Sequence, residues 1–177
     1  AHNYEAHEKL FRLLVGSWRE NWNDPDLPFY YVQLSSIDRP SWPWFRDSQR
    51  RLMDAIPHTG MAVSSDYGDS LDVHPKNKRP IGERLAHWAL NRTYDKKQVV
   101  PSGPLFRSVD FREDAAYVSF DYADGLHTAD GRPIREFEIA ETEGVYYPAK
   151  AEVVGNQVKV YSDRVKHPCL LYTSPSP

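Results

Sequence analysis

The segment Asp72-Val73-His74-Pro75 places a carboxylate two residues before an imidazole. A nearby carboxylate can hold an imidazole in one tautomer and stabilise the imidazolium that forms when the ring takes a proton from a serine. These residue types therefore allow the general base and the orienting acid of a catalytic site that activates a serine. A loop histidine beside an aspartate is also common on plain protein surfaces, so the surrounding elements must decide between the two interpretations.

Helix-like and strand-like segments alternate up to this loop and just beyond it. Predicted helices cover residues 5–22, 41–56 and 75–89, and short, apolar, buried-strand runs cover residues 29–34 and 59–64. Such an α-β-α-β-α order predicts parallel strands covered by helices, in which ligand sites lie at the carboxyl ends of the strands. The polar loop from Ser65 to His74 follows such an end, which favours the catalytic interpretation.

The hydrophobic pattern changes from helical spacing to period 2 at about Val99. Apolar and polar residues alternate through residues 117–122, and Gly155-Asn156 marks the turn of a hairpin. We therefore predict two domains, an α/β part over residues 1–98 and a β-rich, sandwich-like domain over residues 99–168. The strand pattern stops at Cys169, and residues 169–177 resemble a translated cloning or adapter sequence, which predicts a non-native tail.

Composition excludes several classes of protein. The chain has 177 residues, 40% of them hydrophobic, and its net charge of -3 combines 22 basic with 25 acidic residues without a long run of one sign. Neither a nucleic-acid partner nor a membrane surface is indicated, and no apolar stretch reaches the roughly 18 residues of a membrane span. The single cysteine, Cys169, excludes an internal disulfide framework and a multi-cysteine zinc site. The first residues have no initiating methionine and no signal-peptide profile, so we expect the chain to begin inside a larger protein.

Asp72-Val73-His74-Pro75-Lys76-Asn77-Lys78, followed by Ile81-Gly82-Glu83-Arg84-Leu85-Ala86, resembles the final catalytic block of the sialate O-acetylesterase family of serine hydrolases, in the SGNH or GDSL-like superfamily. The resemblance reaches to about Pro168. It continues through residues 28–34, 102–105, 137–140 and 148–151. It implies part of a three-layer α/β/α, flavodoxin-like SGNH hydrolase sheet, followed by a small all-β domain.

The resemblance also implies that the chain is a carboxyl-terminal fragment. In that family the nucleophilic serine comes early, a Gln-Gly-Glu-Ser-Asn segment with an oxyanion-hole asparagine lies midway, and the aspartate and histidine come last. Residues 1–4 resemble the stretch directly after the middle segment. Only His74, as general base, and Asp72, as its orienting carboxylate, therefore carry over to this chain.

The implied activity is the removal of acetyl groups from sugar hydroxyls, with sialic acid or another glycan as substrate. This chemistry requires no metal and no organic cofactor, and an isolated piece without its nucleophile should have little activity. The family implies a periplasmic or secreted location. The sequence indicates neither the oligomeric state nor which sugar is the substrate.

Two neighbours of the pair leave alternatives open. The wider superfamily places its aspartate three residues before the histidine, whereas Asp72 stands two residues before His74, as in the sialate esterase-like branch. Asp69 stays open as an alternative to Asp72. Gly68-Asp69-Ser70-Leu71 spells the superfamily's nucleophile signature, which makes Ser70 a rival nucleophile. A nucleophile of that class should end the first strand and open a helix, whereas Ser70 lies within the histidine's own loop.

Other residue groups allow further functions, each beside a simpler structural explanation. Three such groups are an oxygen-rich metal site at Asp66, Asp69, Asp72 and His74, a sugar-stacking platform at Tyr30, Tyr31, Trp42 and Trp44, and a cationic carboxylate site at Lys76, Lys78 and Arg79. Aromatic residues at helix and strand spacing are more often core residues, and the cations equally fit a solvated helix face. The competing function is a non-catalytic carbohydrate-binding or accessory module, with the β-rich domain as its binding surface.

Overall fold

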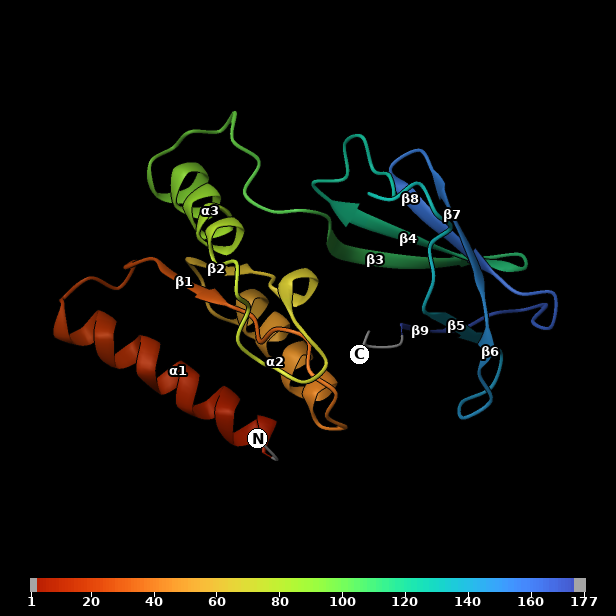
Figure 1. Cartoon of the computed structure of the whole chain (residues 1–177), viewed down its shortest axis with the longest axis horizontal. Helices are drawn as coiled ribbons and strands as arrows, with labels where there is room; N and C mark the ends of the chain where they lie inside the picture. Colours follow the sequence, from red (N-terminus) through yellow and green to blue (C-terminus); the bar gives the residue numbers. More distant parts are fainter. Residues whose placement is uncertain (1–2, 174–177) are drawn as a thin grey trace. The chain divides into compact units, whose positions relative to one another are not determined.

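The computed structural model describes residues 3–173, and the chain forms two compact units (Figure 1). One unit reaches to Ser102 and the other begins at Gly103. The first contains a parallel strand pair with helices, and the second contains only antiparallel sheets. The predicted mixed α/β class, with parallel strands first and antiparallel strands after them, is confirmed. Among the described residues, no helix combines the length and the apolar character needed to cross a membrane.

The first unit alternates helices and strands in the predicted order. Its elements are α1 (Tyr4–Asn21), β1 (Phe29–Val32), α2 (Trp42–Ala55), β2 (Thr59–Ala62), the 3-10 turn η1 (Ser65–Tyr67), α3 (Arg79–Trp88) and the π-helical turn η2 (Ala89–Thr93). β1 and β2 pair in parallel, with Phe29 opposite Thr59 and Val32 opposite Ala62. The sequence therefore located both strands, although each is two residues shorter than predicted.

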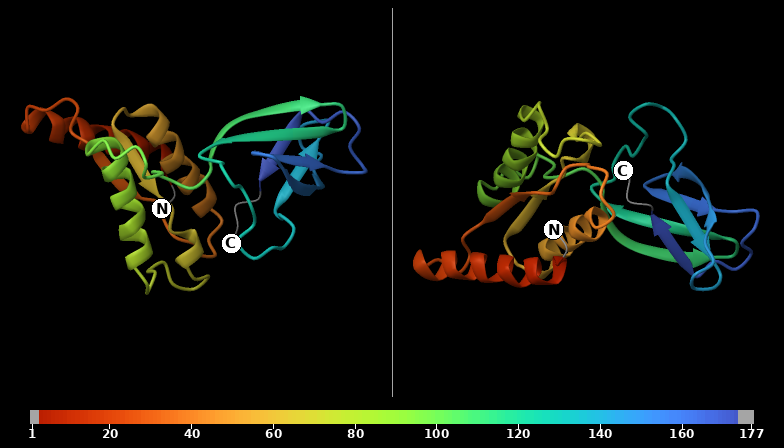
Figure 2. Two further views of the ribbon diagram at one scale, coloured as in Figure 1. Left: turned by 90° about the horizontal axis from the view of Figure 1, so that it is seen from above. Right: turned by 60° about the horizontal axis from the view of Figure 1, so that its bottom comes forward.

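Helices pack against both faces of this strand pair (Figures 1 and 2). On the face of Phe29 and Tyr31, the ring of Phe11 from α1 lies 5.7 Å and 4.9 Å from these two rings. Val15 of α1 is buried there together with Leu52 and Ile56 of the α2 segment. Tyr30 lies between Phe29 and Tyr31 in β1 and points to the opposite face, and Gly60 is its partner in β2, so Gly60 lies on that other face.

Trp88 of α3 covers this second face of the pair. A Cβ atom on Gly60 would lie 2.5 Å from the Trp88 ring, and the indole nitrogen of Trp88 donates to the carbonyl of Met61 at 3.0 Å. Only a residue without a side chain allows the indole this close to β2.

One helical prediction needs correction. The helical spacing of the apolar residues predicts that one face of α1 covers the sheet, yet of these residues only Val15 is fully buried, with 1% of its surface exposed. The predicted face consists of Leu10, Phe11, Leu14, Val15, Trp18 and Trp22. Leu10 is 65% exposed and Leu14 46%, because α1 turns Phe11 and Val15 toward β1 and leaves these leucines on its outer flank.

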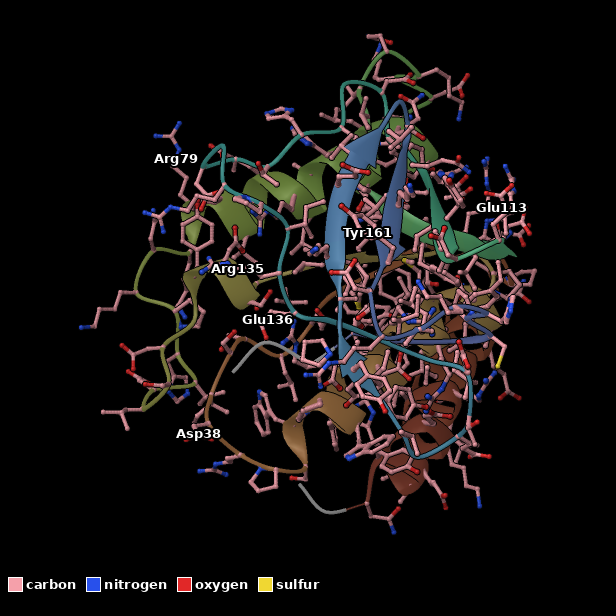
Figure 3. All side chains as sticks on the ribbon, turned by 90° about the vertical axis from the view of Figure 1, so that its right-hand side faces the viewer. Asp38, Arg79, Glu113, Arg135, Glu136 and Tyr161 are labelled. Carbon is pink, nitrogen blue, oxygen red and sulfur yellow. The ribbon has the colours of Figure 1, made fainter. Side chains whose placement is uncertain are left out.

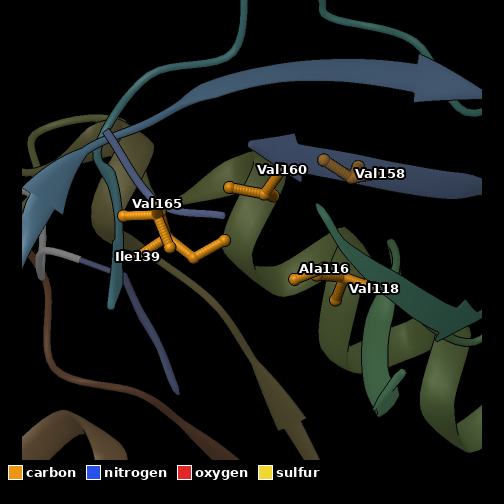
Figure 4. Packing of buried hydrophobic residues seen from close by; sticks show 6 residues of the cluster. All are labelled: Ala116, Val118, Ile139, Val158, Val160 and Val165. Atoms are coloured by element: carbon orange, nitrogen blue, oxygen red, sulfur yellow. The ribbon is translucent and has the colours of Figure 1, made fainter. Parts of the chain in front are cut away.

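The second unit consists of two antiparallel sheets. Its strands are β3 (Leu105–Arg112), β4 (Ala115–Asp121), β5 (Phe137–Ala140), β6 (Tyr147–Pro148), β7 (Lys150–Val154), β8 (Gln157–Tyr161) and β9 (Leu170–Thr173). The four-stranded sheet has the order β3-β4-β8-β7 and the three-stranded sheet the order β6-β5-β9. Alternate residues of β4 and β8 point inward and form a core with Ile139 and Val165 (Figure 4).

The prediction that the strand pattern stops at Cys169 is wrong. Leu170–Thr173 pair antiparallel with β5, the amide of Cys169 donates to Ala140 at 3.0 Å, and Leu171 packs against the buried core of the unit. Two adjacent leucines are enough to add an edge strand when a partner strand supplies the hydrogen bonds. Residues 174–177 of the predicted tail lie outside the described residues, and its non-native origin stays a prediction.

Candidate active site

The loop that follows β2 is fastened to the loop that follows β1. Ser36 donates its hydroxyl to the carbonyl of Ser65 at 3.0 Å, and the amide of Asp38 donates to the carbonyl of Ser70 at 3.0 Å. The hydroxyl of Ser35 donates to the carbonyl of Val73 at 2.5 Å, one residue before His74. The carboxyl ends of two parallel strands thus hold one composite loop, as expected for a ligand site in such a sheet.

Two close contacts fix the base of this composite loop. Buried Ser64 donates its hydroxyl to the carbonyl of Gln33 at 2.7 Å. Gly68 lies directly against Ser36, so that a Cβ atom on Gly68 would be 2.5 Å from the Ser36 nitrogen. The serines at positions 35 and 36 were not singled out by the sequence, although two polar residues directly after a buried strand would have been a usable signal.

Asp72 and His74 contact each other at the exposed end of this loop. The Oδ1 atom of Asp72 accepts from the backbone amide of His74 at 2.9 Å and lies 3.2 Å from its Nδ1 atom. The amide hydrogen bond, with a smaller contribution from the ring, lowers the pKa of the Asp72 carboxyl below its usual value. The carboxylate is therefore ionised at neutral pH and is placed to orient the ring.

The ring geometry leaves the second nitrogen of His74 free for chemistry. With Nδ1 directed at Asp72, the remaining nitrogen, Nε2, is the one that would accept a proton from a serine. Within residues 3–173 this nitrogen makes no hydrogen bond, and the His74 side chain is 81% exposed. The structure thus brings the two predicted residues together in the orientation that a base and its orienting acid require.

Arg84 of α3 anchors the start of the same loop. Its two terminal nitrogens donate to the two carboxylate oxygens of Asp66 at 2.7 Å and 2.6 Å, and one of them also donates to the carbonyl of Val63 at 2.7 Å. This bidentate pairing lowers the pKa of Asp66 and raises that of Arg84. The sequence resemblance included Arg84, but its partner 18 residues away could not be identified from spacing.

The two alternatives beside the pair have different surroundings. Asp69 accepts from the amide of Leu71 at 2.8 Å, whereas the carboxylate in contact with His74 is that of Asp72. Ser70 is exposed, and in the described part of the chain its hydroxyl makes no hydrogen bond, to His74 or to any other group. Its position within a loop, away from any strand-to-helix turn, does not resemble an activated nucleophile.

The proposed metal site and aromatic platform are not assembled. Among residues 3–173, no three His, Cys, Asp or Glu side chains gather in a way that could hold a metal ion, and Asp66 is occupied by Arg84. Tyr31 and Trp42 are buried and donate to the carbonyls of Gln49 and Ser35, both at 2.6 Å. They are structural residues, so the sugar-stacking hypothesis is wrong for these two.

The remaining members of these groups lie at or near the surface. Trp44 is 58% exposed, and the half-buried Tyr30 shares a hydrogen bond of 2.7 Å with Thr93. Lys76, Lys78 and Arg79 are all exposed, and the side chain of Arg79 projects outward (Figure 3). Arg79 pairs with Glu83 one helical turn later at 2.8 Å, which fits the solvated-face interpretation.

Comparison with solved structures gives a match that covers 98% of this chain, a carbohydrate acetylesterase from Xanthomonas citri, with a TM-score of 0.85 and 33% identity. The sialate O-acetylesterases of Rattus norvegicus and Mus musculus are 21% and 24% identical over 90% and 68% of this chain. No family model matches the sequence. Together these matches support a sialate O-acetylesterase-like family for this chain. The predicted resemblance is thereby confirmed.

The chain spans only a part of these relatives. It covers 40% of the Xanthomonas chain, 34% of the rat protein and 26% of the mouse protein. Nearly all of this chain matches the Xanthomonas protein, but most of each relative has no matching residues in this chain.

Proposed function

We propose that this chain carries the general base and the orienting acid of a carbohydrate O-acetylesterase with a Ser-His-Asp mechanism. The observation that carries the proposal is the contact of His74 Nδ1 with Asp72 Oδ1 at 3.2 Å, at the carboxyl ends of two parallel strands. Similarity to a carbohydrate acetylesterase supports the same reaction class. Helices on both faces of the strand pair support a place in a three-layer SGNH hydrolase domain.

In the proposed reaction, a serine hydroxyl attacks the carbonyl carbon of a sugar acetate while Nε2 of His74 takes the hydroxyl proton. The tetrahedral intermediate then expels the sugar oxygen, which receives that proton from His74 and leaves as a sugar hydroxyl. Water, deprotonated by His74, attacks the acetyl-serine and releases acetate and the free serine. Asp72 holds the ring and stabilises its charged form in both halves of the reaction.

The nucleophile and the oxyanion donors are proposed to come from the part of the catalytic domain that lies before the matched region. Ser70 is a poor candidate, because no hydrogen bond in the described residues joins it to His74. We therefore propose that residues 3–173 alone have very little esterase activity. An acetylated glycan, with sialic acid as one example, is the proposed substrate, and a periplasmic or secreted location is part of the same proposal.

A hybrid enzyme tests this function. In the hybrid, this chain replaces the matched part of the Xanthomonas acetylesterase, and release of acetate from acetylated sugars is measured. His74→Ala should lower kcat by on the order of 10⁴-fold, since a triad member removed alone disables the unit. Asp72→Asn should lower kcat by roughly 100-fold or more, because the amide no longer selects the active tautomer. Ser70→Ala, the matched control from the same loop, should leave kcat within about twofold.

Two results would contradict the proposal. One is a folded, active hybrid whose kcat does not respond to His74→Ala. The other is hydrolysis of p-nitrophenyl acetate by the isolated chain that disappears with Ser70→Ala, because this would make Ser70 the nucleophile.

A further inference from the structure

The peptide group between Val73 and His74 has hydrogen bonds at both ends. Its carbonyl oxygen accepts from the hydroxyl of Ser35 at 2.5 Å, and its amide donates to Oδ1 of Asp72 at 2.9 Å. A carbonyl oxygen can only accept, so the serine hydroxyl is the donor. One planar peptide group thus links the loop after β1 to the carboxylate of Asp72.

The two hydrogen bonds of this peptide group strengthen each other. A hydrogen bond to the carbonyl draws electron density toward the oxygen, which makes the N–H of the same peptide group a better donor. That N–H is the largest cause of the lowered pKa of Asp72. The hydroxyl of Ser35 therefore acts on the carboxylate without touching it.

Oxygen Oδ1 of Asp72 faces both the amide and the ring of His74. It lies 2.9 Å from the amide nitrogen and 3.2 Å from Nδ1. The side chains of Asp72 and His74 are 51% and 81% exposed, so packing within the described residues holds them only weakly. A rotation of the peptide group would move the amide away from Oδ1 and release the carboxylate that orients the ring.

Ser35 is itself held firmly. It is 2% exposed, and its carbonyl accepts from the indole nitrogen of Trp42, the first residue of α2, at 2.6 Å. The amide of the preceding residue, Leu34, donates to the side-chain oxygen of Gln49 at 2.9 Å. Ser35 thus connects the packed start of α2 to the exposed end of the loop that carries His74.

We propose that Ser35 is a positioning residue of the candidate site. Through its hydrogen bond to the peptide group before His74, it holds Asp72 in place and thereby orients the imidazole ring. This role rests on the proposed function, since it prepares the general base of that reaction. Ser35 is buried, so it acts through the orienting carboxylate and takes no part in binding the sugar.

The hybrid enzyme described above tests this role by kinetics. Ser35→Ala should lower kcat by roughly 10- to 100-fold, because a general base displaced by about 1 Å loses up to that much. KM should stay within about twofold, because Ser35 does not contact the substrate. Ser48→Ala is the matched control, since Ser48 is also buried and its hydroxyl donates to the carbonyl of Phe45 at 2.8 Å, but that bond stays within α2. The control should keep kcat within about twofold.

Two further variants separate the hydroxyl from its packing. Ser35→Thr keeps the donor, whereas Ser35→Val has the same shape with a methyl group in its place. The threonine variant should keep a kcat at least about fivefold above that of the valine variant, as expected for one hydrogen bond. This comparison holds even where the alanine variant is too unstable to measure.

The isolated chain gives a readout that needs no esterase activity. In an NMR titration, Ser35→Ala should raise the pKa of the Asp72 carboxyl by at least about 0.3, toward its ordinary value of about 3.9. Ser48→Ala should leave this pKa unchanged. The charged groups that act on Asp72, His74 and Lys76, are present in both variants, so the difference reports on the amide hydrogen bond.

Three results would overturn the role of Ser35. The first is a folded Ser35→Ala hybrid with kcat within twofold of the parent hybrid. The second is an equal loss of kcat in the threonine and valine variants, or in Ser35→Ala and Ser48→Ala, since the hydroxyl of Ser35 would then not matter. The third is an unchanged pKa of Asp72 in the isolated Ser35→Ala chain. A hybrid without esterase activity, together with the expected rise of that pKa, would contradict the proposed function alone.

Discussion

The guanidinium of Arg84 on α3 holds both carboxylate oxygens of Asp66, at 2.7 Å and 2.6 Å, across the loop that leads to His74. The same guanidinium lies 5.4 Å from the centre of the Tyr67 ring and pairs with no other carboxylate in the described part of the chain. One side chain therefore ties the 3-10 turn after β2 to the helix that follows the loop. The end of the loop is tied separately, through Ser35 and Val73.

Arg84→Met should destabilise the first unit by about 1 kcal/mol. The change removes the two hydrogen bonds to Asp66 and the one to the carbonyl of Val63, but both side chains of the ion pair are partly exposed, so solvent screens much of their interaction. Arg84→Lys should recover less than half of the loss, because an ammonium group cannot make the bidentate contact. Urea unfolding at neutral pH, with Arg79→Met as the exposed control on the same helix, measures both. Equal stability of the Arg84→Met variant and the parent chain would contradict this role.

The ion pair of Arg84 with Asp66 also predicts that the stability of the fold depends on pH. The pKa of Asp66 is lowered in the folded chain, so its ionised form stabilises the fold above the unfolded pKa of about 4. This stability is lost as the pH falls through the lower, folded pKa. Asp66→Asn should therefore be less stable than the parent at pH 7, and the difference should shrink steadily below about pH 4. A difference that is constant from pH 7 to pH 2 would show that ionisation of Asp66 is not its cause.

The contact between Gly60 and Trp88 predicts opposite effects of one substitution at two glycines. Gly60→Ala should cost about 1–3 kcal/mol, because the new methyl group would lie 2.5 Å from the indole ring. Gly16→Ala, in the middle of α1 with no neighbouring atom within 4 Å, should instead stabilise by about 0.5–1 kcal/mol through helix propensity. Thermal unfolding of the two variants checks the pair. A neutral Gly60→Ala would mean that the indole can move away from β2.

Local sequence signals predicted the elements of the first unit and the two neighbouring residues of the candidate site. Buried-strand runs located β1 and β2, and the contact of Asp72 with His74 needs only two residues of separation. The sequence predicted less accurately which face of α1 is buried. Leu10 and Val15 belong to one apolar pattern, and only the packing of Phe11 on β1 decides which side of the helix turns inward.

Long-range contacts explain the other differences. β9 forms because β5 has a free edge with which it can pair. The sequence after Cys169 does not show that such an edge is present. The attachment of the loop that carries His74 likewise depends on pairs that lie far apart in the chain, such as Ser35 with Val73. Hydroxyl groups of this kind fit many loops equally well, so their partners follow from the fold and cannot be read from residue type.

Gly68→Ala should impair catalysis by separating the two loops that carry the site. The new methyl group would lie 2.5 Å from the nitrogen and 2.9 Å from the Cβ atom of Ser36, so the backbone around Ser65 and Ser70 must shift. A shift of His74 by about 1 Å relative to a serine on another segment should lower kcat by roughly 10- to 100-fold in the hybrid enzyme. Gly82→Ala, in α3 with open space around it, is the matched control and should keep full activity.

Because the φ angle of Gly68 is -79°, an ordinary value for any residue, the loss would come from the contact and not from backbone strain. Full activity of the Gly68→Ala hybrid would show that the loops need not be in close contact for His74 to act.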